Sequence, residues 1–404
     1  MQTLPVPDKR DPGPGLARLL AAGPMVRLRV PVIGEIPFVT THAGCEALLK
    51  DDDLFSTDVV NGHNRRITWF LRLMPRNVRV MTENMLQKDG EEHRRLRKMV
   101  DGSFRRGAVE AWVPRIEALA AELLENWATS EDGDFVRHVA RPFPLAVICE
   151  ILGLPREDRP DFIRWMAAFS RNESVWQLPA TYRSLTRINR YLMARFEERR
   201  AEPGDDLISI LVHAAEGDER LADDEVLAML GLLFIAGHET TTHLISNAVL
   251  TLLDHPAELA RLRADPALEG TAVDELLRHV SAVEMTKPRY LRRDAEFFGV
   301  PLKCGQAVMA HLAAANRDPA VFDDPDRLDL GRRPNRHLAF GGGPHFCLGA
   351  WLAKAELASV LRLLWLRAPD VALAVPPREL QWRGQAGIRV LRSLPLTATP
   401  PAGM

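Results

Sequence analysis

The stretch Arg336–Glu356 reads RHLAFGGGPHFCLGAWLAKAE, and Cys347 lies at its centre. Three successive glycines and Pro344 come just before the cysteine and disfavour both helix and central strand, so we expect a tight, irregular loop. Residues 348–368 have apolar side chains at the i, i+3, i+4 spacing of a buried helix. Cys347 is therefore predicted at a helix N-terminus, where unsatisfied backbone N–H groups and the helix dipole stabilise a thiolate. Such a thiolate is a metal ligand or a nucleophile.

The residues around Cys347 separate these chemistries only in part. A nucleophile needs a base beside it, and His345 lies two residues away. A zinc site needs further Cys or His ligands at short spacing, and none follows Cys347. A single thiolate that faces a side-chain-free glycine surface suits a large flat cofactor whose iron takes one axial ligand from the protein. A buried structural cysteine beside a flexible loop is the alternative without chemistry.

The glycines and the cysteine also form a longer pattern. Phe340, Gly341, Gly343, Cys347 and Gly349 stand in the order F-G-x-G-x-x-x-C-x-G. This pattern resembles the haem-binding signature of the cytochrome P450 family. The resemblance implies haem b, iron protoporphyrin IX, as the cofactor. It also implies that Cys347 binds the iron, and that Phe340, Gly341 and Gly349 contact the same cofactor.

Two positions near the cysteine depart from the family pattern. Gly342 stands where many bacterial members have histidine, and Trp351 stands where they often have proline. Neither position touches the role of Cys347. The departures concern the shape of the surface behind the cysteine, and hence the choice of redox partner.

Length and composition are those of a globular enzyme. The chain has 404 residues, a net charge of -2 and 46% hydrophobic residues, which argues against nucleic-acid binding. No Gly/Ser linker or charge block divides it, so we predict one domain over residues 1–404, with residues 1–20 as an extended N-terminal segment. This segment is polar and proline-rich, with neither a signal peptide's apolar core nor a membrane anchor. Four widely spaced cysteines indicate a reducing cytoplasm.

The N-terminal half contains a predicted hairpin at 25–40, a short helix at 43–50 and an irregular stretch at 56–88. In the family the irregular stretch covers the substrate pocket, which makes Trp69 a candidate pocket residue. Two mostly helical segments follow, 108–154 and 156–200. Trp176 lies where family members have a mobile lid between two helices. For both tryptophans, packing against a neighbour is the alternative interpretation.

Residues 91–104 are predicted to form a basic helix. His93 and Arg97 are four residues apart, so they share one face and can reach one target. This helix resembles the family's haem-contacting helix, in which the matching His and Arg hold a haem propionate. The side chains of Arg94, Arg95 and Lys98 point elsewhere and are candidates for docking an acidic electron donor.

A long apolar helix is predicted from a cap at Asp223 to about His255. It is apolar nearly all round, yet it contains Glu239, and a glutamate in a protein core is unfavourable unless it is paired or functional. The sequence AGHETT, residues 236–241, resembles the family's acid–alcohol motif. By that resemblance Thr240 donates a hydrogen bond to dioxygen at the haem, and Glu239 helps to relay protons. The alternative is a new helix capped at Thr240 or Thr241.

Supporting motifs lie between the long helix and the cysteine. Glu275 and Arg278 are three apart on a predicted helix, and they resemble the family's core ion pair, with Arg327 as the expected third member. Their role would be structural. Arg289 resembles the arginine that holds a haem propionate from a strand, and His345 fits a second contact of that kind.

Together the motifs predict a mainly α protein with smaller β-sheets (α+β), a single P450-type domain with a long central helix over the haem. The implied function is a monooxygenase that uses O2 and two external electrons, from a ferredoxin and its reductase, to oxidise a largely apolar small molecule. Candidate pocket residues besides the two tryptophans are Ile235, Ala236 and Val283. The alternatives are a peroxygenase driven by hydrogen peroxide, which would lack the acid–alcohol pair, and a non-catalytic haem sensor.

Overall fold

The structure is a computed structural model that describes residues 1–30, 34–62, 80, 84–170, 178–216, 219–385 and 387–397. Most of these residues are helical and the sheets are small, which confirms the predicted α+β class. The helices are α1 (Gly13–Ala21), α2 (His42–Lys50), α5 (Gly90–Phe104), α6 (Arg106–Ala128), α7 (Pro142–Ile151), α8 (Arg159–Ser170), α9 (Leu178–Ala201), α10 (Leu207–His213), α11 (Asp223–Asp254), α12 (Pro256–Ala264), α13 (Glu269–Val280), α14 (Leu312–Ala315) and α15 (Ala350–Arg367).

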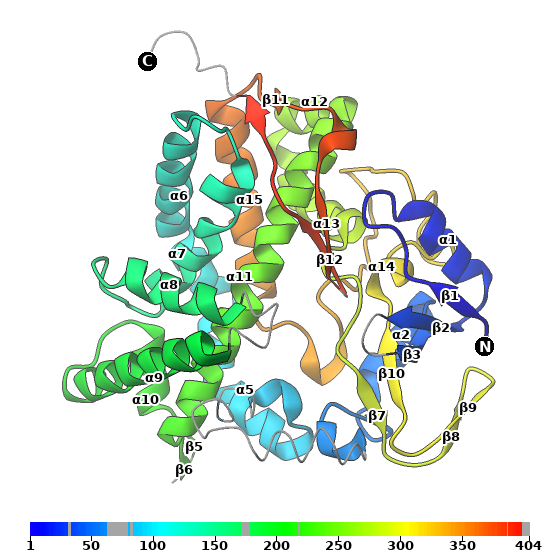
Figure 1. Cartoon of the computed structure of the whole chain (residues 1–404), viewed down its shortest axis with the longest axis horizontal. Helices are drawn as coiled ribbons and strands as arrows, with labels where there is room; N and C mark the ends of the chain where they lie inside the picture. The colour runs from blue at the N-terminus through cyan, green and yellow to red at the C-terminus, as the bar shows by residue number, and fades with distance from the viewer. Residues whose placement is uncertain are drawn as a thin grey trace.

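The largest sheet has six short strands in the order β1-β2-β3-β10-β7-β4. The predicted hairpin at 25–40 forms its antiparallel pair β2–β3, and β10 joins β3 in parallel. The strands are β1 (Thr3–Pro5), β2 (Met25–Val30), β3 (Gly34–Val39), β4 (Phe55–Ser56), β5 (Ala215–Glu216), β6 (Glu219–Arg220), β7 (Arg289–Leu291), β8 (Ala295–Phe297), β9 (Val300–Leu302), β10 (Ala307–Ala310), β11 (Ala372–Leu373), β12 (Trp382–Gln385), β13 (Ile388–Leu391) and β14 (Leu396–Thr397). Figure 1 shows α11 running through the middle of the molecule, with α6, α7 and α15 on one side and this sheet with α1 and α2 on the other.

The N-terminal segment differs from the prediction. Residues 1–20 were expected to be extended, but only β1 is a strand, and α1 begins at Gly13. The helix forms because Leu16 and Leu19 fall on one face and are buried in a core cluster with Val26 and Leu28 of β2. Proline does not prevent this, since Pro14 lies in the first turn, where its missing N–H is not needed.

The helix α11 is continuous through the acid–alcohol motif. The Thr240 hydroxyl donates a hydrogen bond to the Ala236 carbonyl, at 2.7 Å, so Thr240 lies inside the helix and does not cap a new one. The helix starts at Asp223, as expected, but the N-cap is Ala222, and the Asp223 carboxylate pairs with Arg200 instead of capping. Its C-terminus falls just before Pro256.

The buried ion pair predicted on α13 is present, but its third member is different. Arg278 donates to both carboxylate oxygens of Glu275, each at 2.8 Å, and neither side chain is exposed at all. The guanidinium that joins them belongs to Arg332, whose Nε lies 3.2 Å from both Glu275 oxygens. Arg327 contributes only its backbone carbonyl, which accepts from Arg278 and Arg332, because its own side chain is exposed.

This ion pair supports the loop that leads to the cysteine. Arg278 donates to the Asn316 carbonyl at 2.9 Å, and the Asn316 side chain accepts from the Leu338 N–H at 2.7 Å. Leu338 lies directly before the Phe340–Gly343 turn. The loop is therefore linked to the α13 core by hydrogen bonds whose donors and acceptors are buried.

A carboxyl group that the sequence did not single out is buried in α15. The Glu356 side chain is 2% exposed, its Oε2 has no hydrogen-bond partner among the described residues, and burial raises its pKa to about 8. The folded protein therefore keeps the Glu356 proton to about pH 8, whereas the unfolded chain releases it near 4.5. Its contribution to stability is full below pH 4.5 and is lost as the pH rises to about 8.

The variant Glu356→Gln is expected to remove this pH dependence. Its free energy of unfolding should exceed that of the wild type by roughly 2–4 kcal/mol at pH 8.5, with the difference shrinking toward pH 5. Urea unfolding at a series of pH values measures this difference. Equal slopes for the two proteins between pH 5 and 8 would contradict it.

Candidate active site

The loop before Cys347 has the tight geometry that its glycines predict. Gly341 and Gly343 have φ angles of 69° and 66°, in the left-handed region that favours glycine. A Cβ on Gly343 would lie 2.2 Å from the Leu49 carbonyl oxygen, so a side chain there would force the loop away from α2. The Cys347 N–H donates to the Phe340 carbonyl at 3.0 Å and closes the turn. The cysteine thus lies between the glycine loop and α15, as predicted.

The Cys347 side chain is exposed, yet the surrounding protein raises the pKa of its thiol by desolvation. From these two observations we infer that the sulfur lines a hollow in the protein, which we call the cysteine recess. The Gly349 N–H and the charge of Arg97 lower the pKa, as expected at a helix start, but burial outweighs them. The protein by itself therefore favours the neutral thiol of Cys347 over the thiolate. A bound metal ion would provide the positive charge that stabilises the thiolate.

The structure gives no base for a cysteine nucleophile. His345 Nε2 faces Asp89 Oδ1 at 3.8 Å, and its ring stacks on His93 at 4.1 Å between centroids. No hydrogen bond links His345 to Cys347 in the described part of the chain. Nor do the described residues hold a cluster of three His, Cys, Asp or Glu side chains suited to a metal ion. A single-thiolate ligand fits these observations better than a nucleophile or a zinc site.

The two predicted residues of α5 both reach the cysteine loop. Arg97 Nη1 donates to the Phe346 carbonyl at 2.6 Å, while His93 contacts His345. Burial, together with the nearby His345 and Arg97, lowers the pKa of His93 to about 4, so its ring is neutral at pH 7. Arg95 was predicted to be a docking cation for the electron donor. It instead pairs with Glu225 of α11. Arg94 and Lys98 are exposed.

Polar atoms without partners collect beside the loop. Arg289 is 3% exposed, and its Nη1 is buried without a hydrogen-bond partner among the described residues. Nδ1 of His345 is also buried without a partner there, while Nε2 of the same ring faces Asp89. Asp89 also acts on Arg289, so Arg289 and His345 lie in one neighbourhood. A buried cationic donor such as Arg289 Nη1 is expected to meet an anionic group of a ligand.

The predicted residues of α11 lie on a helix face that is less covered than the rest. Most of α11 is buried, but Ala236 is exposed, and Ile235, Glu239 and Thr240 are half-buried. This helix packs against α15, which begins three residues after Cys347. The exposed atoms of Ala236 in an otherwise buried helix indicate free space beside it.

The remaining predicted pocket residues divide into two groups. Val283 forms a backbone bridge with Ile388 and packs against a core cluster, so it is near the start of β13. Trp69 and Trp176 lie outside the described residues. Two buried charged residues that sequence reasoning missed are Arg332 and Glu356; their only sequence signal was a charged residue close to a motif.

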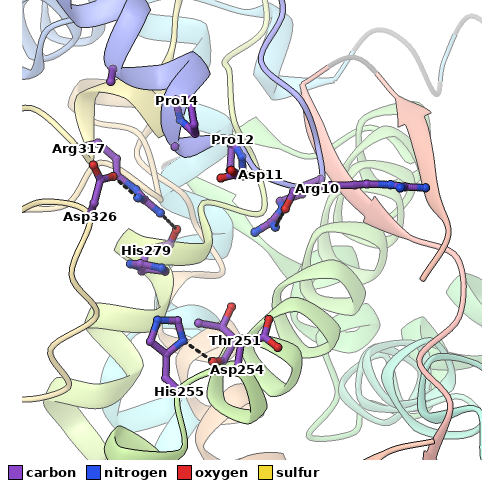
Figure 2. A pocket seen from close by; sticks show the side chains of 13 residues that line it. Arg10, Asp11, Pro12, Pro14, Thr251, Asp254, His255, His279, Arg317 and Asp326 are labelled. Carbon is purple, nitrogen blue, oxygen red and sulfur yellow. Dashed lines mark hydrogen bonds and ion pairs between the residues drawn. The ribbon is translucent and has the colours of Figure 1, made fainter. Parts of the chain in front are cut away.

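A separate polar cavity of about 470 Å³ lies between the N-terminal segment and the ends of α11 and α13. Figure 2 shows its side chains, among them Arg317 paired with Asp326 and His255 bonded to the Thr251 carbonyl. Arg389, also in its lining, donates to the Lys9 and Arg10 carbonyls. Its charged groups thus mainly hold the N-terminal segment, and none of the predicted site residues lines it.

The surroundings of Cys347 therefore combine a tight glycine turn, a free thiol at the start of α15 and the buried, unpartnered Nη1 of Arg289. These features fit a helical protein that holds a flat cofactor with a metal centre and anionic substituents. Comparison with known proteins identifies the family. The model of the family described as "Cytochrome P450" matches residues 72–267 and 268–367, and the chain belongs to the cytochrome P450 family.

Individual relatives agree with this assignment over nearly the full length. The chain is 37% identical to the polyketide biosynthesis cytochrome P450 PksS of Bacillus subtilis, over 89% of this chain and 88% of that protein. It is also 37% identical to the vitamin D(3) 25-hydroxylase of Pseudonocardia autotrophica, covering 97% and 94%. A myxobacterial cytochrome P450 crystallised with myristic acid superposes with a TM-score of 0.86 at 38% identity, covering 96% of each chain. The protein is accordingly an oxidoreductase of the P450 monooxygenase family.

The family's cofactor is a haem held by a thiolate. The residues around Cys347 fit this cofactor, since the thiol is free and exposed and Arg289 Nη1 is a buried donor without a partner among the described residues. Within the described ranges, no helix combines the length and apolar character needed to cross a membrane.

Proposed function

We propose that this protein is a haem b monooxygenase that oxidises a largely apolar small molecule, using O2 and two electrons from a ferredoxin and its reductase. The observation that carries the proposal is the free thiol of Cys347 between the glycine turn, which its own N–H closes on the Phe340 carbonyl, and the start of α15. Family membership supports the class of reaction, and the relatives act on varied compounds: their names include polyketide biosynthesis, vitamin D(3) and mycinamicin IV.

In this proposal each part of the recess has one task. The haem, when bound, supplies the activation of O2, and a thiolate ligand favours cleavage of the O–O bond. Cys347 Sγ would hold the iron, whose positive charge would stabilise the desolvated thiolate. Arg289 Nη1 would donate to a propionate, which would satisfy this buried donor, and His345 lies in the same region with its Nε2 toward Asp89. His93 and Arg97 hold the loop and the same propionate region from α5.

In this proposal, residues of α11 transfer protons. Thr240 holds its hydroxyl proton toward the Ala236 carbonyl, and rotation about its χ1 turns that proton toward the recess. Glu239, the preceding residue in the helix, is half-buried. It passes protons between the solvent and Thr240. Ala236 and Ile235 leave the space in which an apolar substrate lies.

The electron donor is expected to bind behind the cysteine. Trp351 is 43% exposed in the first turn of α15 and lies between the Arg106 and Lys354 cations, 5.4 and 5.3 Å from its ring centre. Arg94 and Lys98 are exposed on α5. Arg106 and Lys354 also pair with Glu110 and Asp274. We propose Arg94 and Lys98 as the cations that meet an acidic ferredoxin. All four cysteines are free, which supports the proposed cytoplasmic location.

The experiment that tests the proposal is the absorption spectrum of the purified, reduced protein with carbon monoxide. A Soret band strongly red-shifted from that of histidine-ligated haem is expected. A protein without haem, or with a histidine-type band, would refute the proposal. Turnover with a surrogate ferredoxin system then separates the enzyme from a haem sensor, and turnover with hydrogen peroxide alone tests the peroxygenase alternative.

The role of Thr240 gives a prediction of its own. Thr240→Ala should lower the product formed per reducing equivalent by about tenfold or more, while oxygen consumption continues, because proton delivery is lost but binding is not. The measurement compares NADPH, peroxide and product yields. Ser246→Ala is the matched control, since Ser246 makes the same bond to a carbonyl one turn earlier in α11 but is fully buried. Equal uncoupling in both variants would contradict the role.

A further inference from the structure

Asp89 stands at the N-cap position of α5 but does not cap that helix. Aspartate is a preferred N-cap residue because its carboxylate accepts hydrogen bonds from the first free N–H groups of a helix. Among the described residues of α5, no N–H donates to the Asp89 carboxylate, although the backbone of Asp89 has the extended conformation of an N-cap. The side chain is nevertheless only 10% exposed. The carboxylate is therefore turned away from α5 and into the protein.

The Asp89 carboxylate joins segments that are far apart in the sequence. From β4 and the residue after it, it accepts from the Ser56 hydroxyl and from the N–H and hydroxyl of Thr57, the last two at 3.0 and 2.7 Å. From the end of β7, the Arg292 guanidinium donates at 2.8 Å. From the cysteine loop, His345 Nε2 lies 3.8 Å from Asp89 Oδ1 and 3.5 Å from the Thr57 hydroxyl oxygen. One carboxylate thus links α5, β4, β7 and the loop that carries the thiolate.

These contacts decide how the His345 ring lies. A carboxylate oxygen only accepts hydrogen bonds, and the proton of the Thr57 hydroxyl already points to Asp89, so both groups beside Nε2 present acceptors. Nε2 accordingly carries a proton and faces Asp89. The ring also packs against His93, at 4.1 Å between centroids. Asp89 therefore fixes which edge of the His345 ring is turned to the rest of the site.

The charge of Asp89 also reaches Arg289, the guanidinium that the proposed function assigns to a propionate. Ser56, which donates to Asp89, is paired in the β4–β7 ladder with the residue that follows Arg289. Asp89 and Asp52 are the acidic groups whose charges act on Arg289. Burial opposes ionisation of Asp89, but hydrogen bonds from His345 and its other partners outweigh it and lower its pKa below the usual range. An ionised carboxylate therefore lies close to the proposed cofactor site.

We propose that Asp89 is a positioning residue that lowers the reduction potential of the haem through His345 and Arg289. The inference rests on the proposed function, because it assumes a haem held by Cys347. A propionate and Asp89 would share the charge of Arg289, so one buried guanidinium would face two carboxylates. Arg292 also pairs with Asp89, but it is 36% exposed and its charge is screened by solvent. The carboxylate that is left partly uncompensated disfavours the arrival of an electron at the iron.

The reduction potential of the purified, substrate-free holoenzyme tests this proposal. Asp89→Asn keeps the shape of the side chain and removes its charge. It should favour the reduced protein by about 3- to 10-fold, which is a rise of about 30 to 60 mV for a one-electron couple. Asp89→Glu retains the charge and should stay near the wild type. Asp294→Asn is the matched control and should leave the potential unchanged, because Asp294 pairs with Lys303 just after β7 but is 59% exposed.

A double variant tests the route through the ring. Combining Asp89→Asn with His345→Phe should shift the potential by less than the sum of the two single shifts, because Asp89 acts in part through His345. Additive shifts would contradict this route, and with it the proposal. Urea unfolding of each variant separates a purely structural role: lower stability of Asp89→Asn with an unchanged potential would show that Asp89 only holds the fold together.

A second variant tests the same charge from the other side. Arg292→Met removes the cation that pairs with Asp89 and should lower the potential, whether or not Asp89→Asn retains its haem. Arg293→Met is the control, since Arg293 is also exposed but donates only to the Asp53 carbonyl. Equal shifts in these two variants, or in Asp89→Asn and Asp294→Asn, would reduce the effect to net charge and overturn the proposal.

The carbon monoxide spectrum distinguishes this inference from the proposed function. It should remain of the thiolate type in the wild type and in each single variant of Asp89, Arg292 and Asp294. An unchanged potential with that spectrum would refute the role of Asp89 alone. Absence of the thiolate band from the wild type would refute both.

Discussion

The variant Cys347→Ser is expected to lose the red-shifted carbon monoxide band and all monooxygenation. A serine hydroxyl is far less acidic than a thiol and is a poor ligand for haem iron, so the haem would be lost or would take another ligand. The protein should still fold, because the substitution is nearly isosteric and the loop is held by its backbone, including the bond from the N–H of residue 347 to the Phe340 carbonyl. Absorption spectra of the reduced protein with carbon monoxide measure the effect.

The matched control is Cys304→Ser. Cys304 is also exposed and free, but it lies on the turn between β9 and β10, where its N–H bonds to Asp294. Its replacement should change neither the spectrum nor turnover. If Cys347→Ser kept the red-shifted band, another residue would have to be the ligand. The assignment of the recess would then be wrong.

The second large effect is expected on stability. Glu275→Gln leaves Arg278 as a fully buried charge without its carboxylate partner, and the free energy of unfolding should fall by roughly 3–5 kcal/mol. Urea unfolding of the purified protein measures this loss. Asp161→Asn is the matched control: Asp161 and Arg164 have the same three-residue spacing, but they are mostly exposed, 54% and 68%. Its effect should stay within about 0.5 kcal/mol.

The same experiment checks the third member of the ion cluster. Arg332→Met should also destabilise, because Arg332 is largely buried and bonds to both oxygens of Glu275. Arg327→Met should be nearly neutral, since the side chain of Arg327 is exposed and only its carbonyl takes part. A larger loss for Arg327→Met than for Arg332→Met would contradict the structure.

Arg327 and Arg332 illustrate where prediction from sequence ends. The E-x-x-R pair was predictable because residues three apart on a helix must meet, whatever the rest of the chain does. The partner from residues 325–335 was not, because the three arginines of this irregular segment, Arg327, Arg332 and Arg333, have no periodicity that tells which one turns inward. The prediction for the N-terminal segment was wrong for a related reason. Its prolines suggested an extended chain. A helix forms instead because it buries Leu16 and Leu19 against β2.

The sequence by itself determined the cysteine turn and the long helix α11. Both depend on local rules: glycine adopts the left-handed φ angles of Gly341 and Gly343 without strain, and apolar periodicity predicts a helix that must cross a core. Only the tertiary structure decided the electrostatics of the recess. The unsatisfied donor of Arg289, the neutral ring of His93 and the protonated Glu356 follow from burial. Burial is set by segments hundreds of residues apart that pack together, and no local pattern records it.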